Sequence, residues 1–203
     1  MIELQAAHLG KKFGDSIVFR DITFSVHSPE VIGIAGPNGS GKSTLLKCLT
    51  RLTAPSKGTI SWKRDDTELD SKQLRAILGY AAPYLSYYSE LSVLENLEFL
   101  VAHHYKLSFD IESLADFFQL TDLLHQPYGS LSSGQQQRCK LTASVVRRPE
   151  VLILDEPGTN LDSSGNEIVR KMVDESRNQG RLTILASNAE NELDLCDRII
   201  SVS

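Results

Sequence analysis

Short apolar runs separated by polar turns dominate the first third of the chain and predict β-strands. They lie at residues 2–9, 18–26 and 31–35. The third run leads directly into a glycine-rich loop, after which leucines recur at helical spacing over residues 44–49. A further strand is predicted at residues 58–62, behind a turn at residues 56–58. The pattern predicts strands, a loop, a helix and another strand in succession.

Helical patterning follows from about residue 92 to residue 146. It opens with Ser92 and Glu95, which have the spacing of a capping box, in which serine and glutamate satisfy each other's free backbone amides. The strand pattern returns as the uninterrupted apolar run 151–154, typical of a strand buried in a parallel sheet. A second capping-box spacing, Ser164 with Glu167, predicts a helix that ends near residue 178. Strands are then predicted at residues 182–186 and 198–202.

This order of elements predicts a single α/β domain over residues 1–203. A helical subdomain is expected to be inserted at about residues 84–146, where the strand pattern is interrupted. A chain of 203 residues, 41% of them hydrophobic, can bury a full core of this kind.

Composition narrows the classes of function. A formal net charge of −5 and a pI near 5.5 disfavour binding that depends on neutralising many nucleic-acid phosphates. The three cysteines lie far apart, so reduced thiols in a cytosolic protein are expected rather than disulfides or zinc. The adjacent His103 and His104 would point about 100° apart on a helix, which predicts a solvated face and no metal site. Because no apolar run approaches the ~20 residues that span a bilayer, any membrane role is expected to act through another chain.

The glycine-rich loop carries the clearest chemistry. It matches the pattern G-x-x-x-x-G-K-[ST] and lies between a strand and a helix, the context that a phosphate-binding loop requires. Its glycines allow successive backbone N–H groups to point inward, and the helix adds its positive N-terminal end. The lysine is expected to reach the β- and γ-phosphates of a nucleotide, and the serine after it to ligate Mg²⁺. The loop consists of Gly36, Pro37, Asn38, Gly39, Ser40, Gly41, Lys42, Ser43 and Thr44.

Two carboxylates follow the buried run 151–154, at the end of a predicted parallel strand where ligands usually bind. Asp155 is predicted to hold Mg²⁺. Glu156 is predicted to accept a proton from the water that attacks the γ-phosphate. On its own, the pair could equally be a solvated turn; the phosphate loop favours the catalytic interpretation.

A third motif precedes the helix that carries Leu141 and Val145. One interpretation is a simple helix cap and a tight turn. The other is a second anion site at a helix N-terminus. Since one nucleotide does not need two such sites on one chain, this site is expected to face ATP bound to a second copy. Its residues are Ser132, Ser133, Gly134 and Gln135.

In order and spacing, these motifs and the run 160–162 resemble the ATP-binding cassette (ABC) ATPases over essentially the whole chain. The resemblance implies a phosphate-loop fold of ABC type, with a mainly parallel core sheet and an N-terminal antiparallel part. It also implies a head-to-tail dimer, of identical or different subunits, that encloses two ATP molecules. Asp162 would lie in the loop that communicates across the dimer, and Phe13 would pack against adenine. At the position of Ser133 the family usually has glycine.

Two positions depart from the family pattern. Asn188 stands where the family usually has a histidine that contacts the γ-phosphate. Asparagine cannot become cationic, and charge-assisted hydrogen bonds are roughly twice as strong as neutral ones. Pro83 stands where the family has a glutamine beside the Mg²⁺, with Tyr84 as a candidate hydroxyl donor. A working but slow ATPase is therefore expected, with Glu156, Lys42 and Asn188 as its catalytic residues.

The resemblance implies the ATPase subunit of a transporter whose membrane-spanning permease is a separate chain, at the cytoplasmic face of the membrane. Within the family, residues 186–188 and the compact chain are most similar to ATPase subunits of the haem-exporter type, associated with cytochrome c biogenesis. The alternatives are an ABC-type ATPase in DNA repair, chromosome organisation or translation, and a regulatory cassette that binds ATP without hydrolysing it.

Overall fold

The computed structural model describes residues 1–102 and 110–202, so the predictions for His103 and His104 lie outside the described residues. Its helices and strands follow one another along the chain as β1 (Ile2–Phe13), β2 (Ser16–His27), β3 (Val31–Ala35), α1 (Lys42–Leu49), β4 (Lys57–Arg64), β5 (Thr67–Glu68), α2 (Ser71–Ile77), β6 (Leu78–Ala81), α3 (Val93–Val101), α4 (Ile111–Phe117), the 3-10 turns η1 (Thr121–Leu123) and η2 (Tyr128–Ser130), α5 (Ser133–Val145), β7 (Val151–Asp155), α6 (Ser163–Asn178), β8 (Leu182–Ser187), α7 (Glu190–Leu193) and β9 (Arg198–Ser201).

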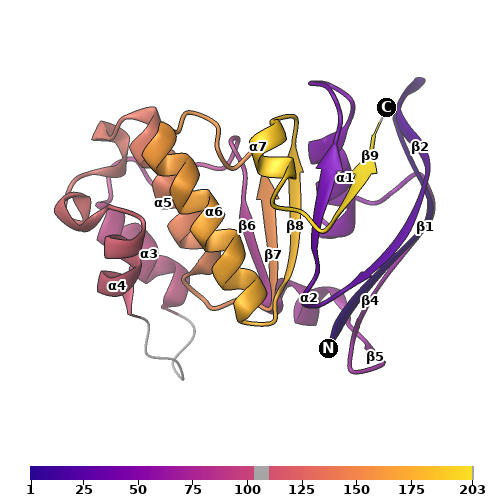
Figure 1. Cartoon of the computed structure of the whole chain (residues 1–203), viewed down its shortest axis with the longest axis horizontal. Helices are drawn as coiled ribbons and strands as arrows, with labels where there is room; N and C mark the ends of the chain where they lie inside the picture. Colours follow the sequence, from indigo (N-terminus) through magenta and orange to yellow (C-terminus); the bar gives the residue numbers. More distant parts are fainter. Residues whose placement is uncertain (103–109, 203) are drawn as a thin grey trace.

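The described strands form two sheets. One is parallel, with the strand order β6-β7-β8-β3-β9, and occupies the middle of Figure 1. The other is antiparallel, with the order β2-β1-β4-β5, and lies at the right of Figure 1. The expected fold class is therefore confirmed. The helices α3 to α5 lie between β6 and β7 in the chain, and the subdomain boundary at about residues 84–146 stays a proposal.

Each face of the parallel sheet covers a different core. Residues of β7 point alternately to the two faces, as the period of a strand requires: Ile153 packs in a cluster with α1, α2 and the antiparallel sheet, and Leu154 packs with the helices α3, α5 and α6. These helices lie at the left of the sheet in Figure 1. Burial on both faces explains why the run 151–154 is apolar throughout.

The first capping box is confirmed. Ser92 caps α3: its hydroxyl accepts from the Glu95 N–H at 3.2 Å, and the Glu95 carboxylate accepts from the Ser92 N–H at 2.7 Å. The prediction of a turn at residues 56–58 was wrong in part, because β4 begins at Lys57. The elements β5, α2, β6 and α7 were not predicted; all are short, so each offers few residues over which a period can be recognised, whereas α4 lies within the helical stretch predicted for residues 92–146.

The prediction of a second capping box, formed by Ser164 and Glu167, was wrong. Helix α6 begins at Ser163, and its N-cap is Asp162, whose carboxylate accepts from the Gly165 N–H at 2.8 Å. Glu167 lies farther into the helix and faces Arg170 at 3.9 Å. An aspartate supplies both a side-chain acceptor and a negative charge to the helix N-terminus, so it takes the cap two residues earlier than the serine would.

We expect Asp162→Ala to lower the melting temperature by a few degrees at neutral pH, because it removes this cap. The hydrogen bond from Gly165 is the main reason that the pKa of Asp162 lies below its ordinary value of 3.8. A carboxyl group whose pKa is lower in the folded state stabilises the fold at pH values above its unfolded-state pKa. This stabilisation is lost as the pH falls through its folded-state pKa. The difference in melting temperature between Asp162→Ala and the wild type should therefore narrow below about pH 3.8, which thermal unfolding measures.

Glu167→Ala is the matched control, since Glu167 occupies the position that the sequence assigned to the cap. It should leave the melting temperature nearly unchanged. An equal loss in the two variants would contradict the assignment of the cap to Asp162.

Candidate functional site

A pocket of about 530 Å³ lies where β3, β7 and β8 end. It brings the glycine-rich loop together with residues that follow the other two strands. This is the edge at which ligands bind in open parallel sheets. Its lining residues are Val18, Asn38, Gly39, Gly41, Lys42, Ser43, Thr44, Glu156, Thr159 and Asn188.

Two glycines of the loop are required by its shape. Gly41 has φ of 102°, in the left-handed region, and a Cβ there would lie 2.5 Å from Val18 Cγ1. A Cβ on Gly36 would lie 2.3 Å from the Val202 carbonyl oxygen. The bare backbone therefore lets the loop pass close to β2 and to the chain after β9. Helix α1 begins at Lys42, so its N-terminal amides and positive end lie at the pocket, which suits an anion.

The side chain of Lys42 lies across the base of the loop and is only 5% exposed. Its Nζ donates to the Gly36 carbonyl at 2.8 Å and lies 3.0 Å from Glu156 Oε1. The loop lysine and the predicted general base are thus direct neighbours. A phosphate that enters here meets a fixed cation, and it competes with Glu156 for that cation.

Asp155 is fully buried at the end of β7, and neither of its carboxylate oxygens has a hydrogen-bond partner of ordinary geometry among the described residues. Burial raises its pKa; the hydroxyl of Ser43 lies near enough to oppose this shift, and Glu156 adds to it. An unpartnered buried carboxylate is unfavourable unless a cation or proton compensates it. Because Mg²⁺ prefers oxygen ligands, the carboxylate of Asp155 and the hydroxyl of Ser43 fit this ion.

Asn188 reaches the pocket from the loop after β8. Its Nδ2 donates to Asn38 Oδ1 at 2.9 Å, which ties this loop to the phosphate loop across 150 residues of sequence. The amide is neutral, and one of its two N–H donors is already engaged. This contact was not predicted, since nothing local in the sequence connects the two asparagines.

The segment of Ser132 to Gln135 does not line the pocket of its own chain. Ser132 caps α5 in a capping box with Gln135: the Ser132 N–H donates to Gln135 Oε1 at 2.9 Å, and the Gln135 N–H donates to Ser132 Oγ at 3.3 Å. Gly134 lies so close to the next loop that a Cβ would be 2.9 Å from the Asn160 carbonyl oxygen. The cap predicted here is present, and the role toward a second ATP stays a prediction.

Phe13 and Asp162 also lie outside the pocket lining. Phe13 ends β1 with its ring 57% exposed and Lys11 Nζ 4.7 Å from the ring centroid, so it is not a core residue. Asp162 faces the α5 residue Arg138 at 3.1 Å in addition to capping α6. The role of Phe13 at adenine and the role of Asp162 across a dimer stay predictions.

Pro83 is exposed, and its carbonyl accepts from Lys140 Nζ at 2.6 Å. The neighbouring Tyr84 has its hydroxyl against that of Tyr80, and Lys47 Nζ lies 3.9 Å from the Tyr84 ring centroid. Burial is the main reason that the pKa of Tyr84 is raised; the hydrogen bond with Tyr80 opposes this shift, and the charge of Asp155 adds to it.

Comparison with known proteins decides the family. A family model described as "ABC transporter" matches residues 19–159, more than half of the chain. The chain belongs to the ABC transporter family. The ABC protein is 33% identical to the "Uncharacterized ABC transporter ATP-binding protein YdbJ" of Bacillus subtilis, over 96% of its own length and 64% of that protein. It is 29% identical to the "Nod factor export ATP-binding protein I" of Sinorhizobium fredii, over 98% of its length and 59% of that protein.

Among solved structures, the ABC protein resembles cbiO1 of Clostridium perfringens, described as part of the ABC transporter complex cbiONQ. The TM-score is 0.80 at 27% identity, and the match covers 98% of this chain and 84% of that one. The chain thus spans less than two thirds of the two curated relatives and most of this solved subunit.

Sequence reasoning missed four features of this ABC protein's site, the first of which is that Val18 of β2 lines the pocket. Thr159 lines the pocket from the loop after β7, and its position at the carboxyl edge of a predicted strand was the available signal. The pairing of Lys42 with Glu156 and the bond between Asn38 and Asn188 had no signal, because each joins separate loops.

Proposed function

We propose that this chain is the ATP-binding and ATP-hydrolysing subunit of an ABC transporter. The observation that carries the proposal is the pocket that joins the loop of Gly36 to Thr44 with the carboxylate of Glu156, 3.0 Å from Lys42. Names of the relatives, all ATP-binding proteins of this family, support it. The direct test is release of phosphate from ATP by the purified chain.

In the proposed reaction, the loop amides and Lys42 hold the β- and γ-phosphates of ATP. The Glu156 carboxylate accepts a proton from a water whose oxygen attacks the γ-phosphorus. The bond from that phosphorus to the β–γ bridging oxygen breaks, so the products are ADP and inorganic phosphate. Lys42 leaves Glu156 for the phosphate as ATP enters, which frees the carboxylate to act as a base.

Asp155 and Ser43 are the proposed ligands of Mg²⁺, because together they offer a hydroxyl and a buried carboxylate that has no hydrogen-bond partner of ordinary geometry in the part of the chain that the structure describes. The ion would neutralise charge that develops on the phosphate oxygens. Burial of Asp155 at the end of β7 fixes its position before the ligand arrives.

The active form is proposed to be a head-to-tail dimer, of two copies or of two different subunits. The segment of Ser132 to Gln135 supports this, since it presents a helix N-terminus and does not line the pocket of its own chain. It would contact the phosphates of ATP in the partner's loop, with Asp162 close to the interface. Phe13, exposed at the end of β1, would pack against adenine.

A separate permease is proposed as the membrane partner, with this chain at the cytoplasmic face. Among the helices that the structure describes, none combines the length and apolar character needed to cross a bilayer. The solved relative cbiO1 is itself described as part of a transporter complex. Pull-down from detergent-solubilised membranes, with identification of the co-purifying chain, tests this part of the proposal.

As a narrower assignment, we propose an ATPase of the haem-exporter type. Its support is the resemblance at residues 186–188, where Asn188 replaces the family's usual histidine. The relatives named above belong to other systems, so the co-purifying permease is the observation that decides it.

Turnover is expected to be slow, and Asn188→His should raise it by up to about tenfold at a pH where the imidazole is protonated. A neutral hydrogen bond contributes about 0.5–1.5 kcal/mol and one to a charged group about 1.5–3 kcal/mol. Each 1.4 kcal/mol is a factor of ten. Steady-state phosphate release and ATP affinity should be measured together, with Asn188→Ala as the control. No gain at equal affinity contradicts the explanation.

A further inference from the structure

The backbone directly after β7 is held in an uncommon conformation. Glu156 has φ of 47°, in the left-handed region that non-glycine residues rarely adopt. Such a conformation costs on the order of 1–3 kcal/mol and persists only where the surroundings hold it. The Glu156 N–H donates to the Ala186 carbonyl at 2.8 Å, and the Glu156 carbonyl accepts from the Thr159 N–H at 3.1 Å, which closes a turn. The direction of the Glu156 side chain therefore also depends on what fixes the central peptide group of this turn, between Pro157 and Gly158.

Two buried side chains from different helices hold that peptide group at both ends. The Pro157 carbonyl accepts from Gln137 Nε2 of α5 at 2.8 Å, and the Gly158 N–H donates to Glu192 Oε1 of α7 at 2.7 Å. Gln137 is 2% exposed and Glu192 is 4% exposed. In a site sheltered from water, both bonds are stronger than they would be at the surface.

Gly158 is required for this approach. A Cβ at this position would lie 2.2 Å from Glu192 Oε1 and 2.6 Å from Asn166 Oδ1. Only a bare backbone allows the carboxylate to reach the amide, so the contact depends on this glycine.

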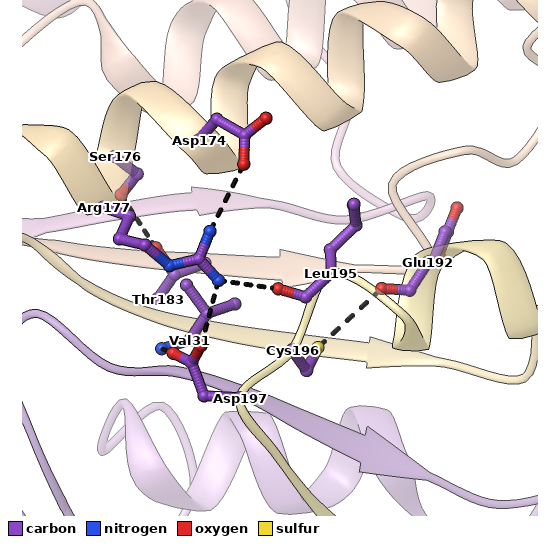
Figure 2. Close-up of polar contacts among 9 residues, drawn as sticks. All are labelled: Val31, Asp174, Ser176, Arg177, Thr183, Glu192, Leu195, Cys196 and Asp197. Carbon is purple, nitrogen blue, oxygen red and sulfur yellow. Dashed lines mark hydrogen bonds and ion pairs between the residues drawn. The ribbon is translucent and has the colours of Figure 1, made fainter.

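Glu192 is presented from a short segment that is secured at both ends. Before α7, the Ala189 N–H donates to Ser187 Oγ at 3.0 Å. After α7, Figure 2 shows the guanidinium of Arg177 reaching the Leu195 carbonyl at 2.9 Å and Asp197 at 3.2 Å. Asp197 in turn accepts from the backbone N–H of β3 at 2.8 Å. The segment around Glu192 is thereby tied to α6 and to the parallel sheet.

The carboxylate of Glu192 is unfavourable as a stabilising group. Its Oε2 is buried without a hydrogen-bond partner among the described residues, and burial raises its pKa. A buried carboxyl with one unsatisfied oxygen costs free energy of folding, so stabilisation of the fold does not explain Glu192 at this position. The bond to the Gly158 N–H, two residues after the proposed general base, indicates a role in the position of that base.

We propose that Gln137 and Glu192 are positioning residues that hold the Pro157–Gly158 peptide and thereby aim Glu156 at the attacking water. This inference rests on the proposed ATPase function. Neither residue lines the pocket; both act through the turn that follows Glu156. They should affect the hydrolytic step and leave ATP binding unchanged, because the phosphate loop is a separate segment.

The test compares Glu192→Ala, Glu192→Gln and Gln137→Leu with the wild type. In Glu192→Ala and in Gln137→Leu, kcat should fall roughly 10- to 100-fold, the range produced by misplacement of a catalytic group by about 1 Å. The ATP dissociation constant should stay within about twofold. Glu192→Gln keeps an acceptor for the Gly158 N–H and should retain most of kcat. Glu190→Ala, an exposed carboxylate on the same helix, is the matched control.

A double-mutant cycle separates positioning from a merely structural role. Since Glu192 acts through Glu156, the losses of residual turnover caused by Glu192→Ala and Glu156→Gln should not add. Additive losses overturn the inference, as does an unchanged kcat per folded molecule in Glu192→Ala and Gln137→Leu. If Glu192→Gln is as slow as Glu192→Ala, the acceptor is not what matters and the inference is also overturned.

A measurement without nucleotide distinguishes this inference from the proposed function. In protein labelled with ¹⁵N-glycine, the Gly158 amide should exchange with solvent faster in Glu192→Ala than in the wild type. Unchanged exchange overturns the contact even if turnover falls. Absence of ATPase activity in the wild type, with and without its membrane partner, instead overturns the proposed function.

Discussion

Replacing Glu156 with glutamine is expected to lower kcat about 100- to 10,000-fold, the contribution typical of a positioned general base. The amide cannot accept the proton of the attacking water. ATP should still bind with nearly unchanged affinity, because Lys42 keeps its bond to the Gly36 carbonyl and the loop is untouched. The ATP-loaded dimer should accumulate, since the step that reopens it is blocked. Phosphate release, nucleotide affinity and light-scattering mass with saturating Mg-ATP measure the three effects.

The control for this variant is Glu190→Gln, which changes an exposed carboxylate and should behave as the wild type. Wild-type turnover in Glu156→Gln would exclude Glu156 as the base. A variant that loses turnover yet stays monomeric with saturating Mg-ATP would contradict the dimer for the isolated chain and point to assembly on the membrane partner.

Lys42→Ala is expected to remove measurable turnover and to weaken ATP binding roughly 10- to 100-fold. A hydrogen bond to a charged group contributes about 1.5–3 kcal/mol, and 1.4 kcal/mol corresponds to a factor of ten. The substitution also leaves Glu156 without the cation 3.0 Å away, so a carboxylate faces the incoming phosphates alone. Titration with a fluorescent ATP analogue measures the affinity.

Lys171→Ala, which removes a lysine from the exposed face of α6, is the matched control and should retain both affinity and turnover. Equal affinity in Lys42→Ala and wild type would show that the phosphates bind elsewhere, and would contradict the assignment of the pocket.

Much of the site could be predicted from local sequence, because each of its parts lies within one short segment of the chain. A strand, a glycine loop and a helix that begins at Lys42 are adjacent in the chain, and the position of Asp155 and Glu156 follows from the buried run before them. The carboxyl edge of a parallel sheet then brings these segments together without further information. Membership in the ABC transporter family was anticipated in the same way, from motifs in a fixed order.

The cap of α6 shows where local reasoning fails. Ser164 with Glu167 has the spacing of a capping box, but Asp162 offers a charged acceptor two residues earlier and also meets Arg138 of α5. A pattern alone does not rank two candidate caps that overlap. The charged carboxylate of Asp162 is the better acceptor at a helix N-terminus, and its contact with Arg138 of α5 adds a partner that the local pattern does not contain.

The sequence by itself thus determined the phosphate loop, the two acids after β7 and the fold that joins them, since each depends on neighbouring residues and on the period of a helix or strand. Only the tertiary structure decided how these groups are held: Lys42 against Glu156, Asn188 against Asn38, and the Gly158 amide against Glu192. In the sequence, Lys42 and Glu156 lie 114 residues apart. Asn38 and Asn188 lie 150 residues apart, and Gly158 and Glu192 lie 34 residues apart. Side chains this distant meet only after the sheet has assembled, so no local pattern encodes them.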